Sequence, residues 1–161
     1  MRTLYILRHG KAVAESEAAT DHARELTARG SHAASRVGEY LKEQGKLPTL
    51  VLASTAARAR QTAELCLAAL EQKATLRLLN ELYLAPPERY LEALATHAKT
   101  HAVVLVVGHN PGLESLVLLL TKRSEHLATA ALVEVELPGA EWSELSSAGR
   151  GVGRFIQAWQ P

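Results

Sequence analysis

Short apolar runs at intervals along the chain constrain its fold most strongly. Residues 4–7, 51–53 and 102–107 are each rich in Leu, Val or Ile, and none of them alternates apolar with polar residues. Runs of this kind are typical of strands covered on both faces, as in a parallel sheet flanked by helices. Residues 76–79 form a weaker strand candidate of similar length.

Helical patterns separate these runs. The first helix begins after Thr27, a residue type that caps helix N-termini, and ends at Gly45, a typical C-terminal cap. Residues 55–72 are rich in Ala and Leu, and residues 87–98 predict a third helix. A fourth helix is predicted with Asn110 as its cap and the following proline at its first position.

The end of the chain has a different pattern. Residues 131–137 alternate, which predicts a half-exposed strand, and residues 154–159 are its candidate antiparallel partner. Strands alternating with helices predict an α/β fold, specifically a three-layer α/β/α sandwich with a mainly parallel central sheet and an antiparallel edge strand. The length of 161 residues suits one domain over residues 1–161.

Composition excludes several classes of partner. A formal net charge of +1 gives no case for nucleic acid, and the apolar runs fall far short of the roughly 20 residues that span a membrane. The chain begins without a signal-peptide pattern, and its one cysteine, Cys66, suits a reducing compartment, so we predict a cytoplasmic protein. His97 and His101 lack an evident third ligand, so we predict no metal and no cofactor.

Polar side chains follow four of the predicted strands. Arg8 and His9 follow the first strand, Arg58 the second, Glu81 the weaker candidate, and His109 the run at residues 102–107. In such sheets, ligands bind outside the carboxyl ends of the strands. If the strands are neighbours, these five side chains converge on one site.

These residue types indicate phosphate chemistry. Two guanidinium groups offer planar sets of donors that suit a phosphate dianion. An imidazole among arginines should have a lowered pKa, which leaves it neutral and able to attack phosphorus. Gly10 would let the backbone approach the phosphate, and Glu81 is placed to protonate a leaving group.

Three motifs carry a family resemblance across nearly the whole chain. LRHG at residues 7–10, STAARARQTAE at residues 54–64 and VVGHNPG at residues 106–112 resemble the histidine phosphatase superfamily, which includes the phosphoglycerate mutases. The resemblance implies a covalent mechanism in which His9 is the nucleophile. It also implies that Arg8 and Arg58 clamp the phosphate, and that His109 contacts the transferring phosphoryl group and stabilises the transition state.

A narrower resemblance is to the SixA-type phosphohistidine phosphatases, through RHGKA, RELTARG and VGHNPGLE. It implies that Arg24 lines the phosphate site. Mutases insert a helical lid between the acid residue and the second histidine, whereas only residues 82–108 separate Glu81 from His109 here. We therefore expect a phosphoglycerate mutase-like fold without a large lid, whose open site suits a phosphorylated side chain on a folded protein.

The resulting prediction is a phosphatase that works through phospho-His9 on a phosphohistidine phosphotransfer domain. Such a substrate reduces the need for an acid at Glu81, because its imidazole leaving group can arrive protonated. Two alternatives stay open: a phosphatase of small phosphate esters, and a non-catalytic module that binds phosphate or a phosphoprotein. A mutase is disfavoured, because re-delivery of the phosphoryl group requires an enclosed site. The sequence does not predict an oligomeric state.

Overall fold

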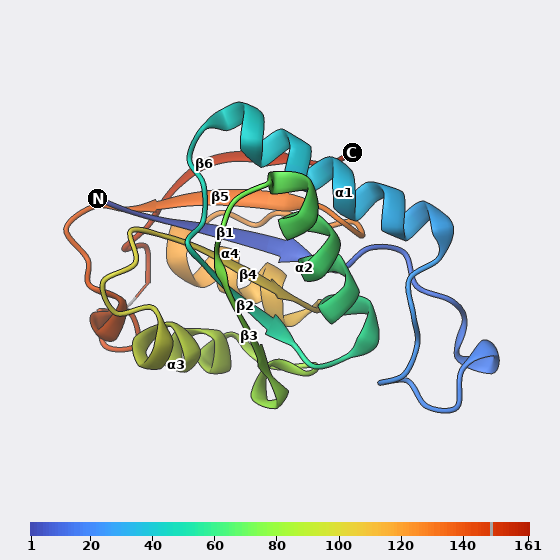
Figure 1. The fold of residues 1–161 in the computed structure, drawn as a ribbon. Coiled ribbons are helices and arrows are strands. Elements are labelled where there is room, and N and C mark those ends of the chain that lie inside the picture. Colours follow the sequence, from blue (N-terminus) through green and yellow to red (C-terminus); the bar gives the residue numbers. More distant parts are fainter. Residues whose placement is uncertain (149) are drawn as a thin grey trace.

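A computed structural model describes residues 1–148 and 150–161 of the chain, and Figure 1 shows its arrangement. The strands are β1 (Arg2–Arg8), β2 (Leu50–Ser54), β3 (Thr75–Leu79), β4 (Val103–Gly108), β5 (Leu132–Leu137) and β6 (Arg154–Trp159). The α-helices are α1 (Ala28–Gln44), α2 (Ala57–Leu70), α3 (Pro87–His97) and α4 (Gly112–Thr121). Three short 3₁₀ turns complete the described elements: η1 (Glu15–Glu17), η2 (Asn80–Leu82) and η3 (Trp142–Glu144).

The six strands form one sheet in the order β3-β2-β4-β1-β5-β6. The first four strands of this order are parallel to one another, whereas β5 is antiparallel to both of its neighbours. The predicted α/β class with a mainly parallel sheet is confirmed. The antiparallel strand β5 lies one position in from the edge, and β6 forms the edge itself.

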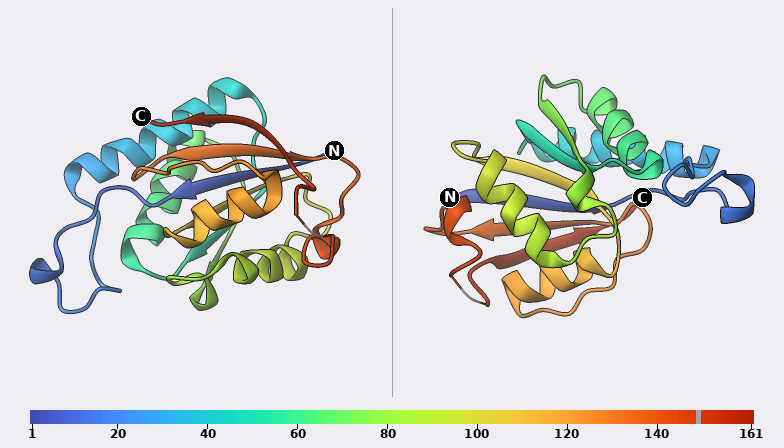
Figure 2. Two further views of the ribbon diagram at one scale, coloured as in Figure 1. Left: turned by 180° about the vertical axis from the view of Figure 1, so that it is seen from behind. Right: turned by 90° about the horizontal axis from the view of Figure 1, so that it is seen from below.

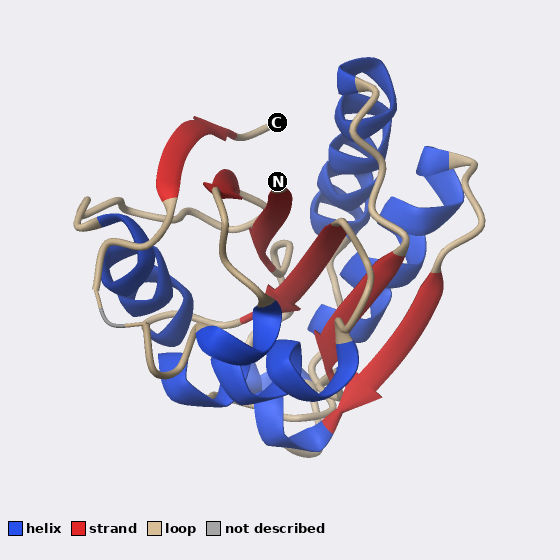
Figure 3. Ribbon diagram, turned by 90° about the vertical axis from the view of Figure 1, so that its left-hand side faces the viewer, coloured by secondary structure: helices blue, strands red, loops and turns tan. Residues whose placement is uncertain are grey.

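Helices cover both faces of the sheet, as the side view shows (Figure 3). On β1, Leu4 and Ile6 join the core shared with α3 and α4, while Tyr5 and Leu7 join the core shared with α1 and α2. Successive side chains of β1 point to opposite faces of the sheet, and both faces are covered by helices. The strand therefore contributes to two apolar cores, which explains why residues 4–7 are all apolar. Within the described residues, every helix is too short or too polar to cross a membrane.

The helix boundaries follow local signals in the sequence. The Thr27 side chain accepts a hydrogen bond from the Gly30 backbone N–H at 3.0 Å, and Gly45 ends α1 in the left-handed conformation with φ of 75°. The predicted cap of α4 is wrong. The helix begins at Gly112, directly after Pro111. The Asn110 amide nitrogen donates to Glu114 and to a carbonyl of the 122–131 loop, whereas its oxygen, the atom that a cap would use, accepts no hydrogen bond among the described residues.

The prediction of a half-exposed strand at residues 131–137 is also wrong. All but one of the residues of β5 are buried, including Glu134 at 5% exposure. Lys46 from the end of α1 donates to Glu134 at 2.8 Å, and Gln157 from β6 donates to its other oxygen at 2.9 Å. These distant partners allow a carboxylate to stay buried on a strand that lies between two others.

The segment between β1 and α1 projects beyond the end of the sheet that carries the carboxyl termini of the parallel strands (Figures 1 and 2). Its two ends are tied together by an antiparallel bridge between Ala12 and Leu26 and by backbone hydrogen bonds on either side of it. Between these ends, residues 14–25 form the tip, which contains η1. This segment thus brings further side chains to the edge where the predicted site lies.

Candidate active site

A cavity of about 330 Å³ opens at the carboxyl ends of β1 and β4. Its walls come from both strand ends, from α2 and from the projecting segment. The lining residues are Arg8, His9, Glu15, Asp21, Arg24, Arg58, Leu84, His109 and Asn110. Five of the six residues predicted for the site, all except Glu81, therefore meet in one place.

His9 follows β1 directly and is only 8% exposed. Its ring Nδ1 lies 2.8 Å from the Gly10 carbonyl, which can only accept, so Nδ1 carries the proton and Nε2 keeps its lone pair. Burial, with smaller contributions from the nearby Arg58 and Arg8, lowers the pKa of His9 to about 4. The sequence predicted a lowered pKa for His9 from the neighbouring arginines alone. In the structure, burial of the ring is the larger cause of the lowered pKa.

His109 follows β4, and its ring lies with its centroid 5.2 Å from that of His9. Its Nε2 is 2.8 Å from the Ser54 hydroxyl, which itself accepts from the Ala56 N–H. We assign the hydroxyl proton to the bond with Nε2, which places the imidazole proton on Nδ1. Burial, His9 and Arg58 together lower the pKa of His109 to about 3. The second histidine is thus a neutral donor beside the first.

Three arginines surround the pair of histidines, and a backbone carbonyl holds each of them. The pairs are Arg8 Nη1 with Leu127 O at 3.1 Å, Arg24 Nε with Val13 O at 2.8 Å, and Arg58 Nη1 with Asp21 O at 2.8 Å. Carbonyl anchors fix the guanidinium planes and leave other N–H groups of each arginine for a ligand. The site is therefore prepared for a multiply charged anion.

Unpartnered polar nitrogens support this interpretation. Within the described residues, Arg8 Nε, Arg58 Nε and His109 Nδ1 are buried and have no hydrogen-bond partner. Buried polar atoms without partners are costly, and these three lie on residues that line the cavity, as does a fourth such atom, the acceptor Asn110 Oδ1. The lining of the cavity therefore carries polar atoms that the protein itself leaves without partners.

Asp21 and Tyr83 belong to the site, although the sequence did not indicate them. The Asp21 carboxylate accepts from Arg24 Nη1 at 2.9 Å, from Arg58 Nη2 at 3.1 Å and from the Tyr83 hydroxyl at 2.5 Å. The hydroxyl and both guanidinium groups hold the pKa of Asp21 well below its usual range. In the sequence, only one feature could have indicated a role for Asp21. It lies three residues before Arg24, which is a common spacing for surface ion pairs.

Glu81 does not reach this cavity. It is exposed on η2 and lines a separate shallow depression with Arg89 and His97. Its strand, β3, is the edge strand, three positions from β1 and hence roughly 14 Å away at the usual spacing of strands. Leu82 beside it is fully buried, so the η2 turn directs the leucine inward and the carboxylate outward.

Gly10 has a packing role that differs from the predicted one. A Cβ atom at this position would lie 2.8 Å from the carbonyl oxygen of Gly30, at the start of α1. The Gly10 N–H donates to the Thr62 hydroxyl at 3.0 Å. The glycine therefore permits close contact between the residue after His9 and α1.

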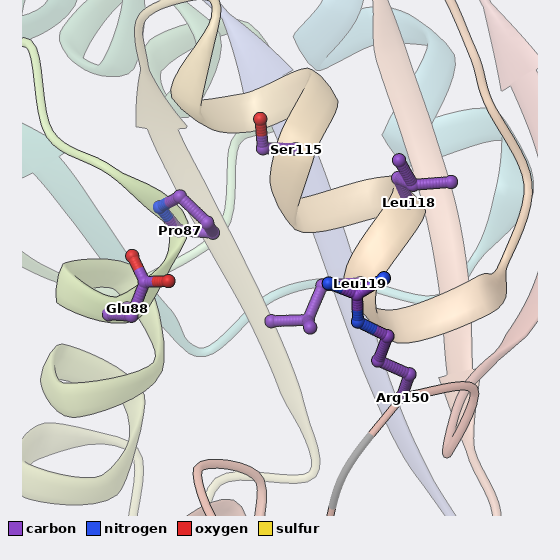
Figure 4. A pocket seen from close by; sticks show the side chains of 6 residues that line it. All are labelled: Pro87, Glu88, Ser115, Leu118, Leu119 and Arg150. Carbon is purple, nitrogen blue, oxygen red and sulfur yellow. The ribbon is translucent and has the colours of Figure 1, made fainter.

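Another depression lies between the start of α3 and α4 (Figure 4). Its lining residues are Pro87, Glu88, Ser115, Leu118, Leu119 and Arg150. It contains none of the residues predicted for the site. Within residues 1–148 and 150–161, no group of three or more His, Cys, Asp or Glu side chains could hold a metal ion.

The fold and the cavity together define an α/β protein with two neutral histidines in an arginine-lined cavity. The chain belongs to the histidine phosphatase superfamily (branch 1), whose sequence profile matches residues 4–84. An uncharacterized protein of Mycobacterium tuberculosis strain H37Rv is 33% identical over 144 residues, which cover 89% of this chain and 88% of the relative.

Solved structures give a closer assignment within that superfamily. The chain superposes on a protein of Nakamurella multipartitia that is proposed to be the phosphohistidine phosphatase SixA, with a TM-score of 0.83 and 31% identity over 99% of this chain and 96% of the other. It also superposes on the protein histidine phosphatase SixA complexed with tungstate, with a TM-score of 0.77 and 29% identity over 98% and 96% of the two chains. The SixA-type resemblance of the sequence is confirmed.

Proposed function

We propose that this protein is a phosphatase that hydrolyses protein phosphohistidine through a covalent intermediate at His9. The observation that carries the proposal is the hydrogen bond between His9 Nδ1 and the Gly10 carbonyl. It leaves Nε2 as the nitrogen with a lone pair, on a ring that lines a cavity with three arginines. A neutral, oriented imidazole is not needed for binding phosphate, but it is needed for attack on phosphorus.

The first step transfers the phosphoryl group to the enzyme. The His9 Nε2 lone pair forms a bond to phosphorus while the bond from phosphorus to the leaving nitrogen breaks, and the leaving imidazole takes that electron pair. Arg8, Arg24 and Arg58 stabilise the charge on the equatorial oxygens, and His109 donates from Nδ1 to one of them. In the second step, water attacks phosphorus, the bond to Nε2 breaks, and its electron pair returns to His9. Both water protons leave on the product as dihydrogen phosphate, which then loses one to solvent.

The predicted proton donor Glu81 lies outside the cavity, which favours an imidazole leaving group. Of the two carboxylates that line the cavity among the described residues, Asp21 is held ionised by its partners, and Glu15 lies on the tip of the projecting segment. An alkoxide leaving group requires a proton at the moment of bond cleavage, whereas an imidazole of phosphohistidine can already carry one. This supports phosphohistidine over an alkyl phosphate.

The openness of the site favours a protein substrate. Between Glu81 and His109 the chain forms only η2, α3 and β4, and Leu84 at the rim of the cavity is 57% exposed. A phosphorylated side chain on a folded domain can enter such a site, and the exposed leucine offers apolar contact to its carrier. A phosphohistidine phosphotransfer domain in the cytoplasm is the partner that we propose.

Turnover of three donors tests this function. We expect rapid release of phosphate from a phosphotransfer domain phosphorylated on histidine, slower release from p-nitrophenyl phosphate and very slow release from glycerol phosphate. Equal or faster turnover of the alkyl ester would support a small-ester phosphatase instead. Tight binding of phosphate without turnover of any donor would support a non-catalytic binding module.

A further inference from the structure

The Asp21 carboxylate occupies N–H groups of the same arginines that would bind a phosphoryl group. Oδ1 accepts from Arg24 Nη1 at 2.9 Å, and Oδ2 accepts from Arg58 Nη2 at 3.1 Å. All three side chains line the cavity. A carboxylate and a phosphate recognise guanidinium groups through the same geometry of paired oxygens. The unliganded site thus already contains one anion of its own.

Positioning of the arginines does not explain this carboxylate. Arg24 is anchored through Nε by the Val13 carbonyl, and Arg58 through Nη1 by the backbone carbonyl of Asp21. Neither of these backbone contacts involves the side-chain charge of Asp21. The carboxylate is therefore an additional partner whose main effect is on the charge of the site.

The two sides of this ion pair also differ in their freedom to move. The Arg58 side chain is 3% exposed, whereas that of Asp21 is 31% exposed and lies on the projecting segment between β1 and α1. An incoming anion that displaces the carboxylate toward solvent breaks its hydrogen bond to the Tyr83 hydroxyl but leaves the buried guanidinium in place. The exchange of one anion for another keeps Arg58 paired throughout, which avoids the cost of a buried unpaired charge.

We propose that Asp21 is an internal counter-anion that competes with the phosphoryl group for Arg24 and Arg58. It neutralises these arginines in the free site and weakens the binding of the phosphate product, so that product release does not limit turnover. The inference extends the proposed function, because it concerns the same phosphate site. It assigns to Asp21 a control of affinity and leaves the chemical step to His9.

The sign of the effect on phosphate binding tests this role. Asp21→Asn keeps the size of the side chain and its acceptor oxygen but removes the charge. We expect the dissociation constant for inorganic phosphate, measured by calorimetry at low ionic strength, to fall at least tenfold. We also expect kcat to fall and product inhibition by phosphate to increase at least tenfold. Weaker phosphate binding in this variant would show a positioning role and overturn the proposal.

Two further variants separate specific competition from a general change in charge. Asp21→Glu retains the charge and should bind phosphate within about threefold of the wild type. Glu15→Gln removes another cavity-lining carboxylate, one without an arginine partner among the described residues, and should tighten binding much less than Asp21→Asn. An equal effect of Glu15→Gln would overturn the proposal, because net charge alone would then account for it. Asp21→Ala provides a second charge removal if the asparagine variant does not fold.

The binding measurement is independent of turnover. If the wild type hydrolyses no phosphohistidine but Asp21→Asn still tightens phosphate, the proposed function fails and the role of Asp21 stands. If turnover occurs but phosphate binding is unchanged or weaker in the variant, the role of Asp21 fails and the proposed function stands. If neither the wild type nor the variant binds phosphate, the proposal that Asp21 competes with phosphate is also overturned.

Discussion

The rings of His9 and His109 lie with their centroids 5.2 Å apart and their planes tilted by 54°, at the ends of adjacent parallel strands. Register places Arg8 of β1 opposite Gly108 of β4, so the residues that follow them emerge side by side. Gly108 is required there, because a Cβ atom would lie 1.9 Å from the Tyr90 hydroxyl. The sheet thus fixes the distance between the two histidines before any loop contributes.

Removal of Arg58 should reduce both rate and affinity. In Arg58→Ala, the cavity loses a buried guanidinium that faces the anion in the ground state and in the transition state, so we expect kcat to fall roughly 10²–10³-fold and KM to rise. Steady-state kinetics on p-nitrophenyl phosphate measures both. Arg60→Ala is the matched control, since Arg60 lies two residues along α2 and pairs only with Glu64 among the described residues. Equal losses in the two variants would contradict the assigned role.

Ser54 should orient His109. In Ser54→Ala, Nε2 of His109 loses its hydrogen bond within a buried site, so we expect kcat/KM to fall about five- to tenfold, the effect of about 1 kcal/mol. Nitrogen NMR of the imidazole should show a mixture of tautomers in the variant and a single one in the wild type. Ser115→Ala, in the depression between α3 and α4, is the control. A single unchanged tautomer in Ser54→Ala would refute this role for the hydroxyl.

The free energy of unfolding should depend on pH through the buried histidines. The unfolded His9 ring has a pKa near 6.5, whereas burial lowers it to about 4 in the folded protein. Between these values the unfolded state binds a proton that the folded state does not, so stability falls as pH decreases from 6.5 to 4. The contribution of His9 is roughly 3 kcal/mol at about 1.4 kcal/mol per pKa unit.

Denaturant titrations at several pH values test this dependence. His9→Ala should lose less stability than the wild type across the window from pH 6.5 to pH 4. Ser115→Ala, in the depression between α3 and α4, is the control and should follow the wild type. If His9→Ala and the wild type lose stability in parallel, His9 is not held neutral by burial.

Substitution of Glu81 should have little effect on any donor. Because Glu81 lines a separate depression, we expect Glu81→Gln to change kcat less than twofold for both p-nitrophenyl phosphate and an alkyl phosphate. Glu92→Gln, in the same depression, is the control. A selective loss of activity on the alkyl phosphate would instead show that Glu81 acts as the proton donor.

The parts that the sequence predicted correctly depend on local or repetitive signals. The buried strands, the cap at Thr27 and the placement of Arg8, His9 and His109 at strand ends all follow from short-range patterns and the general geometry of parallel sheets. The same reasoning failed for Glu81, because it assumed that every strand end is near the others. Sheet order, which periodicity does not reveal, places β3 at the edge.

Long-range pairing accounts for the other differences. Alternation along β5 indicated a solvent-exposed face, but Lys46 and Gln157 bury Glu134 from positions far away in the chain. Asp21 was not found because it lies in an irregular segment whose return to Arg58 depends on the tertiary structure. Such contacts have no periodic signature in the sequence.

Trapping of the covalent intermediate tests the central claim most directly. The protein is mixed with a phosphohistidine phosphotransfer domain, quenched within milliseconds in alkaline denaturant to preserve phosphohistidine, and mapped by mass spectrometry and phosphorus NMR. We predict one phosphoryl group on Nε2 of His9, absent from His9→Ala, and release of phosphate by the wild type alone. Release of phosphate by His9→Ala, or a phosphoryl group on a different residue, would contradict the account.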